Sequence, residues 1–356
     1  MILYFSIFLV VSYFAYLEVL DIAKGVTLRL LYICSFFLFA LSFMRWERGT
    51  DWDTYYLLWE TLEWDNMIIM EPIFSSVNIL TREFFDNYTV HLFVLSSILF
   101  GFQTISIKRY SLYPLLSLMM LVGSQLGNVF YVRQNIAIAI ALFSFIYIIK
   151  GKFANYLLCV FLAIGFHYSA IVFLPSWWIC KLEIGPRKWL VLIILSVFSS
   201  FLMMAILKIV GDLLGGGILY RIIYYTENDI EANPNISYPI QVAKAILNKG
   251  AFLIIAFYLL NKKTENALTN KFVNLYCFGV ILFFLTMPIS IHFARASWYY
   301  DIFQIFIIPL FMSSIKERKN RQIVFLVMFP IYLVKLYVFI MGYKDLYVPY
   351  NLAPIF

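Results

Sequence analysis

The sequence predicts an all-α, polytopic integral membrane helical bundle of about 11–12 transmembrane segments. Hydrophobic residues make up 63% of the 356 residues and charged residues only 13%, too few to coat a water-soluble globule. Many apolar runs reach the roughly 20 residues that a helix needs to cross a bilayer. Runs such as WLVLIILSVFSSFLMMAIL do not alternate polar and apolar residues, so a transmembrane β-barrel is excluded.

We expect a single transmembrane domain over residues 1–356. The predicted spans are roughly 2–20, 29–44, 89–107, 112–128, 134–149, 153–166, 168–180, 189–210, 241–260, 272–290, 299–314 and 322–341. The pair 153–166 and 168–180 is short for two full crossings, so the sequence leaves open whether 153–180 crosses once or twice. The charge pattern favours two short or re-entrant segments that meet at His167.

Most basic residues gather in six short turns between apolar runs. These residues are Lys24 and Arg29; Lys108 and Arg109; Lys150 and Lys152; Lys181, Arg187 and Lys188; Lys262, Lys263 and Lys271; and Lys316, Arg318, Lys319 and Arg321. The positive-inside rule places these turns in the cytoplasm. The net charge of +7 then reflects orientation and anionic lipid, and nucleic acid is not expected as a partner.

Two long segments, about 45–88 and 211–240, are predicted on the outer (periplasmic) side. The first contains two amphipathic stretches, DTYYLLWETLEW and EPIFSSVNILTREFF, and Glu71-Pro72 is a natural helix start. The second is predicted to be a loop, because GDLLGGG contains three consecutive glycines. The same topology predicts that Asp51, His167, Asn228 and Arg295 face outside.

Arg133 and Arg295 stand out because each lies in a narrow connection between two apolar runs, on the side that positive-inside bias disfavours. A guanidinium binds phosphate oxygens in a bidentate manner, so several of them in one pocket suit a diphosphate. Aromatic residues nearby suit the apolar faces of sugar rings, and the nearby carboxylates suit sugar hydroxyls. Two simpler interpretations stay open: an interfacial belt of Trp and Tyr, and arginines that are paired with local acids.

Asp51 and His167 are the two candidate general bases. Asp51 follows Gly49 and Thr50, which we expect to form a turn or a helix cap, and His167 lies between two apolar runs. No metal-ligand spacing marks the chain, since Asp51 and Asp53 by themselves are a weak signal. The four cysteines suggest neither a metal site nor a disulfide. No cofactor and no metal site are predicted.

At these residues the chain resembles the EpsG-type branch of the Wzy-like polysaccharide polymerases. That family has an Arg four residues before Gly-Thr-Asp, then an aromatic residue, and a Tyr four residues after the Asp. The matching residues here are Arg45, Gly49, Thr50, Asp51, Trp52 and Tyr55; then Glu71-Pro72, Arg133-Gln134, FHYSAIVFLP with His167 and Ser169, Arg295 ahead of Tyr299 and Tyr300, and the terminal YVPY with Pro349 and Tyr350. Arg48 departs from the small apolar residue that is usual there.

The resemblance implies a metal-independent glycosyltransferase of the bacterial inner membrane. It would join undecaprenyl-diphosphate-linked oligosaccharide repeat units of O-antigen, capsule or exopolysaccharide on the outer face. The residues expected in catalysis are Asp51, His167, Arg133 and Arg295. Those expected to bind substrate are Arg45, Arg48, Trp52, Tyr55, Glu71, Gln134 and Tyr299. Further partners implied are the growing polysaccharide, the lipid bilayer, a chain-length regulator and a flippase.

Two other function classes remain open from the sequence. A flippase or exporter of the lipid-linked oligosaccharide should carry ionisable groups near the midplane and show repeat symmetry, and no internal repeat is visible here. A membrane glycan ligase or acyltransferase is the third interpretation. An acyltransferase needs polar residues where acyl-CoA can reach them, and the predicted cytoplasmic turns contain no His.

Overall fold

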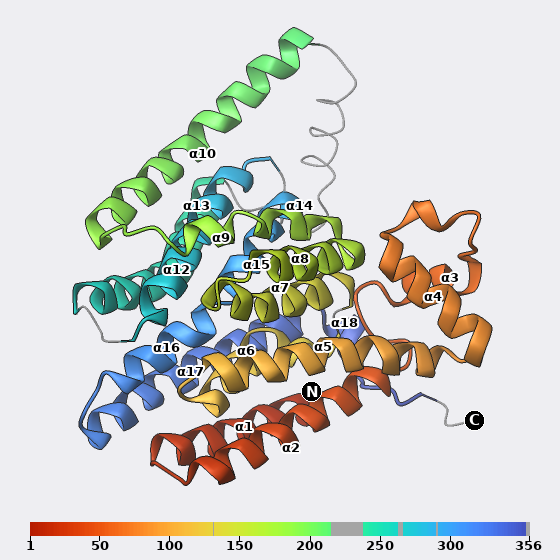
Figure 1. The fold of residues 1–356 in the computed structure, drawn as a ribbon, viewed down its shortest axis with the longest axis horizontal. Helices are drawn as coiled ribbons and strands as arrows, with labels where there is room; N and C mark the ends of the chain where they lie inside the picture. Colours follow the sequence, from red (N-terminus) through yellow and green to blue (C-terminus); the bar gives the residue numbers. More distant parts are fainter. Residues whose placement is uncertain (131, 215–237, 263–265, 290, 354–356) are drawn as a thin grey trace. The chain divides into compact units, whose positions relative to one another are not determined.

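The structure is a computed structural model that describes residues 1–130, 132–214, 238–262, 266–289 and 291–353. These residues form α-helices and 3₁₀-helices, and an isolated β-bridge joins Arg45 to Leu352 (Figure 1). Seven of the described helices are long and apolar enough to cross a bilayer. The predicted fold class is therefore confirmed: the chain is a multi-pass, all-helical membrane protein.

The chain divides into two compact units. The first unit contains Met1–Ile171 and Met312–Phe356, and the second contains Val172–Phe311. Each unit has its own internal packing and is described by itself below. The single transmembrane domain over residues 1–356 stays a prediction.

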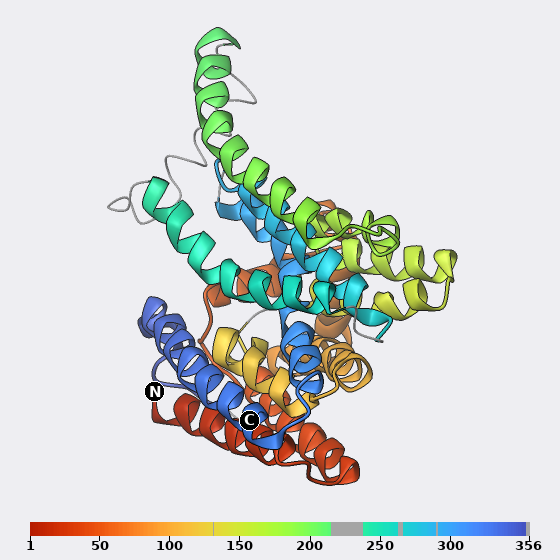
Figure 2. The same cartoon turned by 90° about the vertical axis from the view of Figure 1, so that its left-hand side faces the viewer.

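The first unit contains most of the helices. They are α1 (Ile2–Val19), α2 (Lys24–Phe43), α3 (Trp52–Thr61), η1 (Met67–Ile69), α4 (Pro72–Phe85), α5 (Tyr88–Tyr110), α6 (Pro114–Gln125), η2 (Leu126–Asn128), α7 (Arg133–Ile149), α8 (Phe153–Phe166), α17 (Arg318–Gly342) and α18 (Lys344–Tyr347). Helix α17 packs against α1 and α6, although these segments lie far apart in the sequence (Figures 1 and 2). Helix α5 packs against α2 and α7, and α7 forms a hairpin with α8.

Local sequence explains where several of these helices begin and end. Pro72 and Pro114 occupy the first turns of α4 and α6, where a missing N–H costs nothing. Asn87 caps α5, because its side-chain oxygen accepts hydrogen bonds from the N–H groups of Thr89 (2.9 Å) and Val90 (3.3 Å). The predicted amphipathic stretches of the 45–88 segment are confirmed as α3 and α4, and α4 begins at Pro72 as expected.

One end of the first unit gathers basic turns. Arg321, at the start of α17, forms a salt bridge of 2.5 Å with Asp21, just after α1, and donates to Tyr113 OH, just before α6. The carboxylate of Glu18 accepts a hydrogen bond from the N–H of Leu116 in α6 (3.0 Å). The turns after α1, α5 and before α17 therefore meet at this end, and the other ends of α1, α2 and α17 lie a helix length away.

The second unit is built around α13. Its helices are α9 (Ser176–Ile179), α10 (Pro186–Leu214), α12 (Tyr238–Asn261), α13 (Leu268–Thr286), α14 (Ile291–Ala294), η4 (Arg295–Ser297) and α15 (Trp298–Asp301). Both α10 and α12 pack on α13. The boundaries between the two units fall within η3 (Tyr168–Phe173) and α16 (Gln304–Ser313).

Some of the predicted spans differ from the structure. Span 112–128 contains the shorter helix α6, and 299–314 is divided into α15 and α16, whereas 134–149 and 153–166 agree with α7 and α8. Helix α8 ends at Phe166 and His167 is extended (φ −159°, ψ 119°), so 153–180 is not one continuous helix. The predicted loop at 211–240 is helical up to Leu214 and again from Tyr238, and 215–237, with Asn228, lies outside the described residues.

Candidate functional site

Arg133, the first residue of α7, is the centre of a polar cluster in the first unit. Its NH1 forms a salt bridge with Glu71 Oε2 (2.9 Å), and its Nε donates to the hydroxyl of Tyr55 (3.2 Å). The guanidinium also lies over the rings of Tyr55 (5.3 Å) and Phe74 (5.5 Å). These contacts fix the cation in one orientation, while 21% of its side chain stays exposed.

Glu71 connects Arg133 to the segment that follows α8. The carboxylate is buried, and its second oxygen accepts a hydrogen bond from the backbone N–H of Tyr168 (3.3 Å). The Tyr168 hydroxyl in turn donates to the carbonyl of Met70 (3.4 Å). We call Tyr55, Glu71, Arg133 and Tyr168 the Arg133 cluster; α3, the N-cap of α4, the start of α7 and the start of η3 supply its members.

A glycine allows α4 and α8 to approach closely at this cluster. A Cβ at Gly165 would overlap the side chain of Ile73, two residues after Glu71. The Gly165 position therefore lets α8 pack directly against the first turn of α4. This close packing brings the Tyr168 N–H within reach of Glu71.

The hydroxyl of Tyr55 keeps its proton at neutral pH. Burial raises its pKa, and the partial opposing effect of Arg133 does not reverse that direction. Because the hydroxyl oxygen accepts from Arg133 Nε, its own O–H can donate to another acceptor. The cluster thus combines a fixed cation with a neutral hydroxyl donor.

His167 follows α8 directly and is bonded to Ser169. Its Nδ1 lies 3.2 Å from the backbone N of Ser169 and 2.7 Å from the Ser169 hydroxyl. A backbone N–H can only donate, so Nδ1 is the acceptor and the neutral ring carries its proton on Nε2. In this tautomer His167 offers an N–H donor at Nε2.

Asp51 is exposed at the N-cap position of α3, one turn before Tyr55. Its Oδ2 accepts a hydrogen bond from the hydroxyl of Thr50 (3.3 Å), and its carbonyl accepts from the N–H of Tyr55 (3.0 Å). The expected turn before Asp51 is confirmed, with Gly49 at φ 133°. The carboxylate is therefore attached to the same helix that supplies Tyr55 to the Arg133 cluster.

Residues 44–49 pair with residues 345–353 of the same unit, and we call this contact the C-terminal pairing. The N–H of Trp46 donates to the carbonyl of Asn351 (3.0 Å), next to the β-bridge of Arg45 and Leu352. The two ends of the sequence resemblance, near Arg45 and at YVPY, therefore lie side by side.

Arg45 and Arg48 both belong to the C-terminal pairing, in different surroundings. Arg45 is only 3% exposed, and its NH1 donates to the carbonyl of Val129 (2.7 Å). Burial lowers its pKa, yet a guanidinium remains charged at neutral pH. Arg48 donates to the carbonyl of Asp345 (3.2 Å), and its guanidinium faces the side-chain amide oxygen of Asn351.

Trp52 is buried in an aromatic cluster next to α5. Its ring meets Trp46 (5.5 Å) and Tyr88 (5.0 Å) edge to face, and Trp59 packs in the same cluster. Trp52 therefore packs inside the first unit and does not belong to the Arg133 cluster. Gln134 is half-buried beside Arg133, on the next position of α7.

The second unit contains Arg295 and Tyr299. Arg295 lies over the ring of Trp298 (5.6 Å), and Tyr299 is buried. Sequence reasoning missed the partly buried ion pair in this unit, in which Lys249 Nζ contacts Asp301 Oδ1 (2.7 Å). The sequence also predicts that Arg295 shares one cavity near the outer leaflet with Arg45, Asp51, Arg133 and His167. This stays a prediction, because Arg295 belongs to the second unit and the other four to the first.

Met70 and Tyr168 are the members of the first-unit site that sequence reasoning did not single out. Met70 Sδ lies 3.0 Å from Arg133 NH1. A usable signal existed, because each residue is the immediate neighbour of a predicted one, Glu71 or His167.

Within the described ranges, no group of three or more His, Cys, Asp or Glu side chains is placed to hold a metal ion.

Comparison with known proteins identifies the family. No curated protein and no solved structure gives a significant match. The profile of the EpsG family matches residues 28–352, which include every part of the site described above. The chain therefore belongs to the EpsG family.

Proposed function

We propose that this protein is a polysaccharide polymerase of the bacterial inner membrane, in line with the polymerase-type role that EpsG membership suggests. It would join undecaprenyl-diphosphate-linked oligosaccharide repeat units on the outer face. The observation that carries the proposal is the Arg133 cluster: a partly exposed guanidinium is held by Glu71 and Tyr55 in a membrane protein of this family. Such a group suits a diphosphate leaving group.

The proposed reaction is a glycosyl transfer. A hydroxyl oxygen of the acceptor repeat unit attacks the anomeric carbon of the growing chain, and a new C–O bond forms. The bond between that carbon and the diphosphate oxygen breaks, and undecaprenyl diphosphate leaves with the bonding electron pair. The hydroxyl proton passes to a base. Arg133 would offset the charge that develops on the departing diphosphate, and Arg295 is proposed to assist it.

We assign the base to Asp51 and an anion- or acceptor-positioning role to His167. Asp51 is an exposed carboxylate one turn from Tyr55. His167 accepts at Nδ1 from Ser169, so its Nε2–H is suited to donate to a phosphate or sugar oxygen. Tyr55, Glu71 and Gln134 are proposed to bind substrate, together with Arg48, Trp52 and Tyr299, whereas Arg45, which was also expected to bind it, is proposed to act through the fold.

Reconstitution with purified lipid-linked repeat units tests the proposal. We expect wild-type protein to lengthen the saccharide and to release one undecaprenyl diphosphate for each bond formed. If the repeat units only change leaflet, without growth, the chain is a flippase and the proposal fails. If the oligosaccharide is transferred to a different acceptor and no polymer forms, the ligase interpretation replaces the polymerase proposal.

The same assay tests the assigned base. Asp51→Asn should lower turnover about 10²–10⁴-fold while the lipid-linked substrate still binds. The matched control is Asp53→Asn, which removes an exposed carboxylate from the first turn of the same helix. We expect His167→Ala to weaken substrate binding more than turnover. Near-normal polymer from Asp51→Asn would remove Asp51 from the mechanism.

A further inference from the structure

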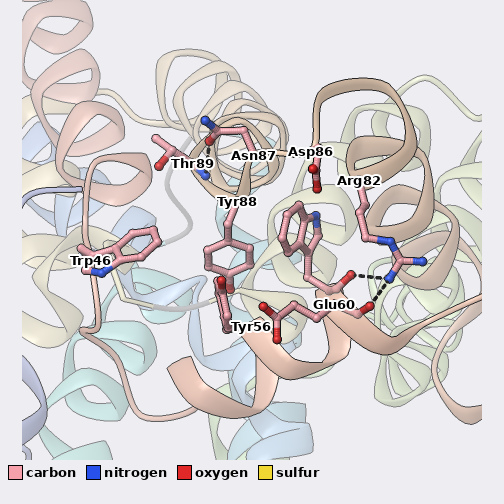
Figure 3. A pocket seen from close by; sticks show the side chains of 9 residues that line it. Trp46, Tyr56, Glu60, Arg82, Asp86, Asn87, Tyr88 and Thr89 are labelled. Carbon is pink, nitrogen blue, oxygen red and sulfur yellow. Dashed lines mark hydrogen bonds between the residues drawn. The ribbon is translucent and has the colours of Figure 1, made fainter. Parts of the chain in front are cut away.

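A cavity of about 530 Å³ opens in the first unit beside α3 and the turn between α4 and α5 (Figure 3). Its volume lies within the ~300–1,000 Å³ of typical ligand sites. None of its lining residues belongs to the Arg133 cluster. Consecutive residues of an α-helix point about 100° apart, so Tyr55 reaches Arg133 while Tyr56 lines the cavity.

Four of the nine residues that line the cavity are aromatic. Trp46, Tyr56, Trp59 and Tyr88 line it, and Figure 3 shows Trp46, Tyr56 and Tyr88 grouped on one side. Tyr56 and Tyr88 meet edge to face with ring centroids 5.0 Å apart, and Trp59 meets Tyr88 at 5.4 Å. These contacts hold the rings in place, so that an apolar ligand face can pack on them with little loss of side-chain entropy.

The polar rim of the cavity is suited to hydroxyl groups. Glu60 and Asp86 are exposed carboxylates on its lining, and carboxylate oxygens accept hydrogen bonds from hydroxyls. The hydroxyl of Tyr56 is hydrogen-bonded to Glu60, which raises the Tyr56 pKa. Asn87 uses its side-chain oxygen to cap α5, so its amide NH₂ is oriented as a donor at the same rim.

The one arginine of this lining is not arranged as an anion site. Arg82 NH1 donates to the carbonyls of Trp59 (2.8 Å) and Glu60 (2.5 Å), and NH2 donates to the carbonyl of Leu62. These bonds hold the end of α3 to α4. With Arg82 directed to the backbone and two carboxylates at the rim, the cavity disfavours a diphosphate.

A further observation indicates a missing hydrogen-bond acceptor. Trp59 is 5% exposed, and its indole Nε1–H has no acceptor among the described residues. A buried donor without a partner costs free energy, and this donor belongs to a residue that lines the cavity.

We propose that this cavity is a saccharide-binding subsite, which holds an uncharged segment of the oligosaccharide apart from its diphosphate. Aromatic faces bind the apolar faces of sugar rings, and the carboxylates and amide bind hydroxyls. The proposal rests on the proposed function, since it divides one substrate between two sites on different faces of α3. Arg133 takes the diphosphate end, and the cavity takes sugars further along.

Direct binding to full-length protein in nanodiscs tests the subsite. The probe is the repeat-unit oligosaccharide released from its lipid diphosphate, measured by calorimetry, with inorganic diphosphate as a second probe. We expect Trp46→Leu, Glu60→Gln and Asp86→Asn each to weaken oligosaccharide binding about tenfold or more. The same changes should leave diphosphate binding unaltered, whereas Arg133→Ala should weaken it.

Matched controls lie in the same segment. Trp64→Leu removes an exposed Trp outside the cavity, and Glu63→Gln neutralises an exposed Glu of the same loop. Both controls should bind oligosaccharide like the wild type. Asp86→Asn keeps the left-handed backbone there (φ 44°), because Asn tolerates that conformation, and Glu60→Gln changes an exposed side chain, so neither should unfold the protein.

Two outcomes separate this inference from the proposed function. Unchanged oligosaccharide affinity in all three cavity variants, or an equal loss in the controls, overturns the subsite even if wild-type protein makes polymer. Specific loss of binding in the cavity variants supports the subsite even if wild-type protein makes no polymer in the reconstituted assay. A cavity that binds diphosphate in preference to oligosaccharide also overturns it.

Discussion

Arg45 and Arg133 are both arginines of the first unit and both belong to the family resemblance, yet their surroundings differ. Arg45 is 3% exposed, and its guanidinium donates to a backbone carbonyl, that of Val129. Arg133 keeps 21% of its side chain exposed, is paired with Glu71 and lies against aromatic rings. The first is enclosed by the C-terminal pairing, and the second forms the centre of the Arg133 cluster.

This difference indicates how similar residues can divide structural and chemical roles. A buried guanidinium that is directed to a carbonyl holds two loops together, whereas a partly exposed one that is held by a carboxylate can also contact an anion. We therefore expect Arg45 to act mainly through folding and Arg133 mainly through turnover. Substitutions at four positions test that contrast, in order of expected effect.

Arg133→Ala should have the largest effect. Polymer formation should fall about 10²–10³-fold, or roughly 2.7–4 kcal/mol, if the guanidinium acts like one preorganised charge donor on a leaving group. Arg133→Lys should recover little, because an ammonium cannot reproduce the bidentate geometry. The rate and the thermal unfolding midpoint should both be measured, with Arg29→Ala, an exposed arginine of a basic turn, as control. If a lower unfolding midpoint accounts for the lost rate, Arg133 acts through folding as Arg45 does, and the contrast fails.

Arg45→Ala should destabilise the fold by about 1.5–3 kcal/mol, because a hydrogen bond from a charged donor is lost and the Val129 carbonyl loses its partner. Turnover per folded molecule should change little. The check is the yield of monodisperse protein and its unfolding midpoint in detergent, followed by a rate corrected for folded fraction. A large loss of turnover at normal stability would instead support direct contact between Arg45 and substrate.

Glu71→Gln tests how far Glu71 positions Arg133. The single amide oxygen of Gln can accept from Arg133 or from the Tyr168 N–H but cannot replace both carboxylate oxygens, and the ion pair with Arg133 is lost. We expect this to cost about 1–1.5 kcal/mol, or roughly a tenfold change in rate. Glu71→Ala should cost more, since Arg133 then loses its orientation. A double-mutant cycle with Arg133→Ala measures the coupling, and strictly additive effects would exclude positioning by Glu71.

Tyr350→Phe should have the smallest effect, in the C-terminal pairing. The Tyr350 hydroxyl donates to the carbonyl of Leu41 (2.8 Å), so its loss should cost about 1 kcal/mol of stability. Burial raises the pKa of Tyr350 from 10.0 to about 12, with Arg45 opposing. Between these two pH values the folded state keeps a proton that the unfolded state releases, so the stability that Tyr350 contributes is complete below pH 10 and is lost as the pH rises to 12. The unfolding midpoint of Tyr350→Phe should therefore fall less than that of the wild type over this pH range. An equal fall in both proteins would contradict this assignment.

Short-range features of the fold were predictable from the sequence. Proline placement predicted that α4 starts at Pro72, and amphipathic periodicity predicted the helices α3 and α4. The basic turns before residue 153 and after residue 180 favoured a break at His167. The division of 299–314 at Ile302–Phe303 and the shortness of α6 were not predictable, because hydropathy alone does not report where a buried helix ends. Hydropathy also failed to locate the end of α10, so residues 211–214 of the predicted 211–240 loop are helical.

The candidate site was predictable as a set of residues but not as an arrangement. Arg133 was expected in catalysis and Glu71 and Tyr55 in substrate binding, and the structure brings both within hydrogen-bond distance of Arg133. Trp52 was expected with them, yet it packs in the aromatic cluster, because α3 presents Trp52 and Tyr55 to different neighbours. The cavity beside Tyr56 had no sequence signature, since its lining comes from three helices and two connecting segments.

By itself the sequence determined that the chain is a helical membrane protein with basic turns and a polar, aromatic segment, and its short motifs indicated the family. Those properties depend on composition and on local order along the chain. Only the tertiary structure decided that Glu71, 62 residues before Arg133, is its partner, and that residue 45 pairs with residue 352. The reason is physical: such contacts depend on how helices pack, as at Gly165, and side-chain periodicity carries no information on which distant residues will meet.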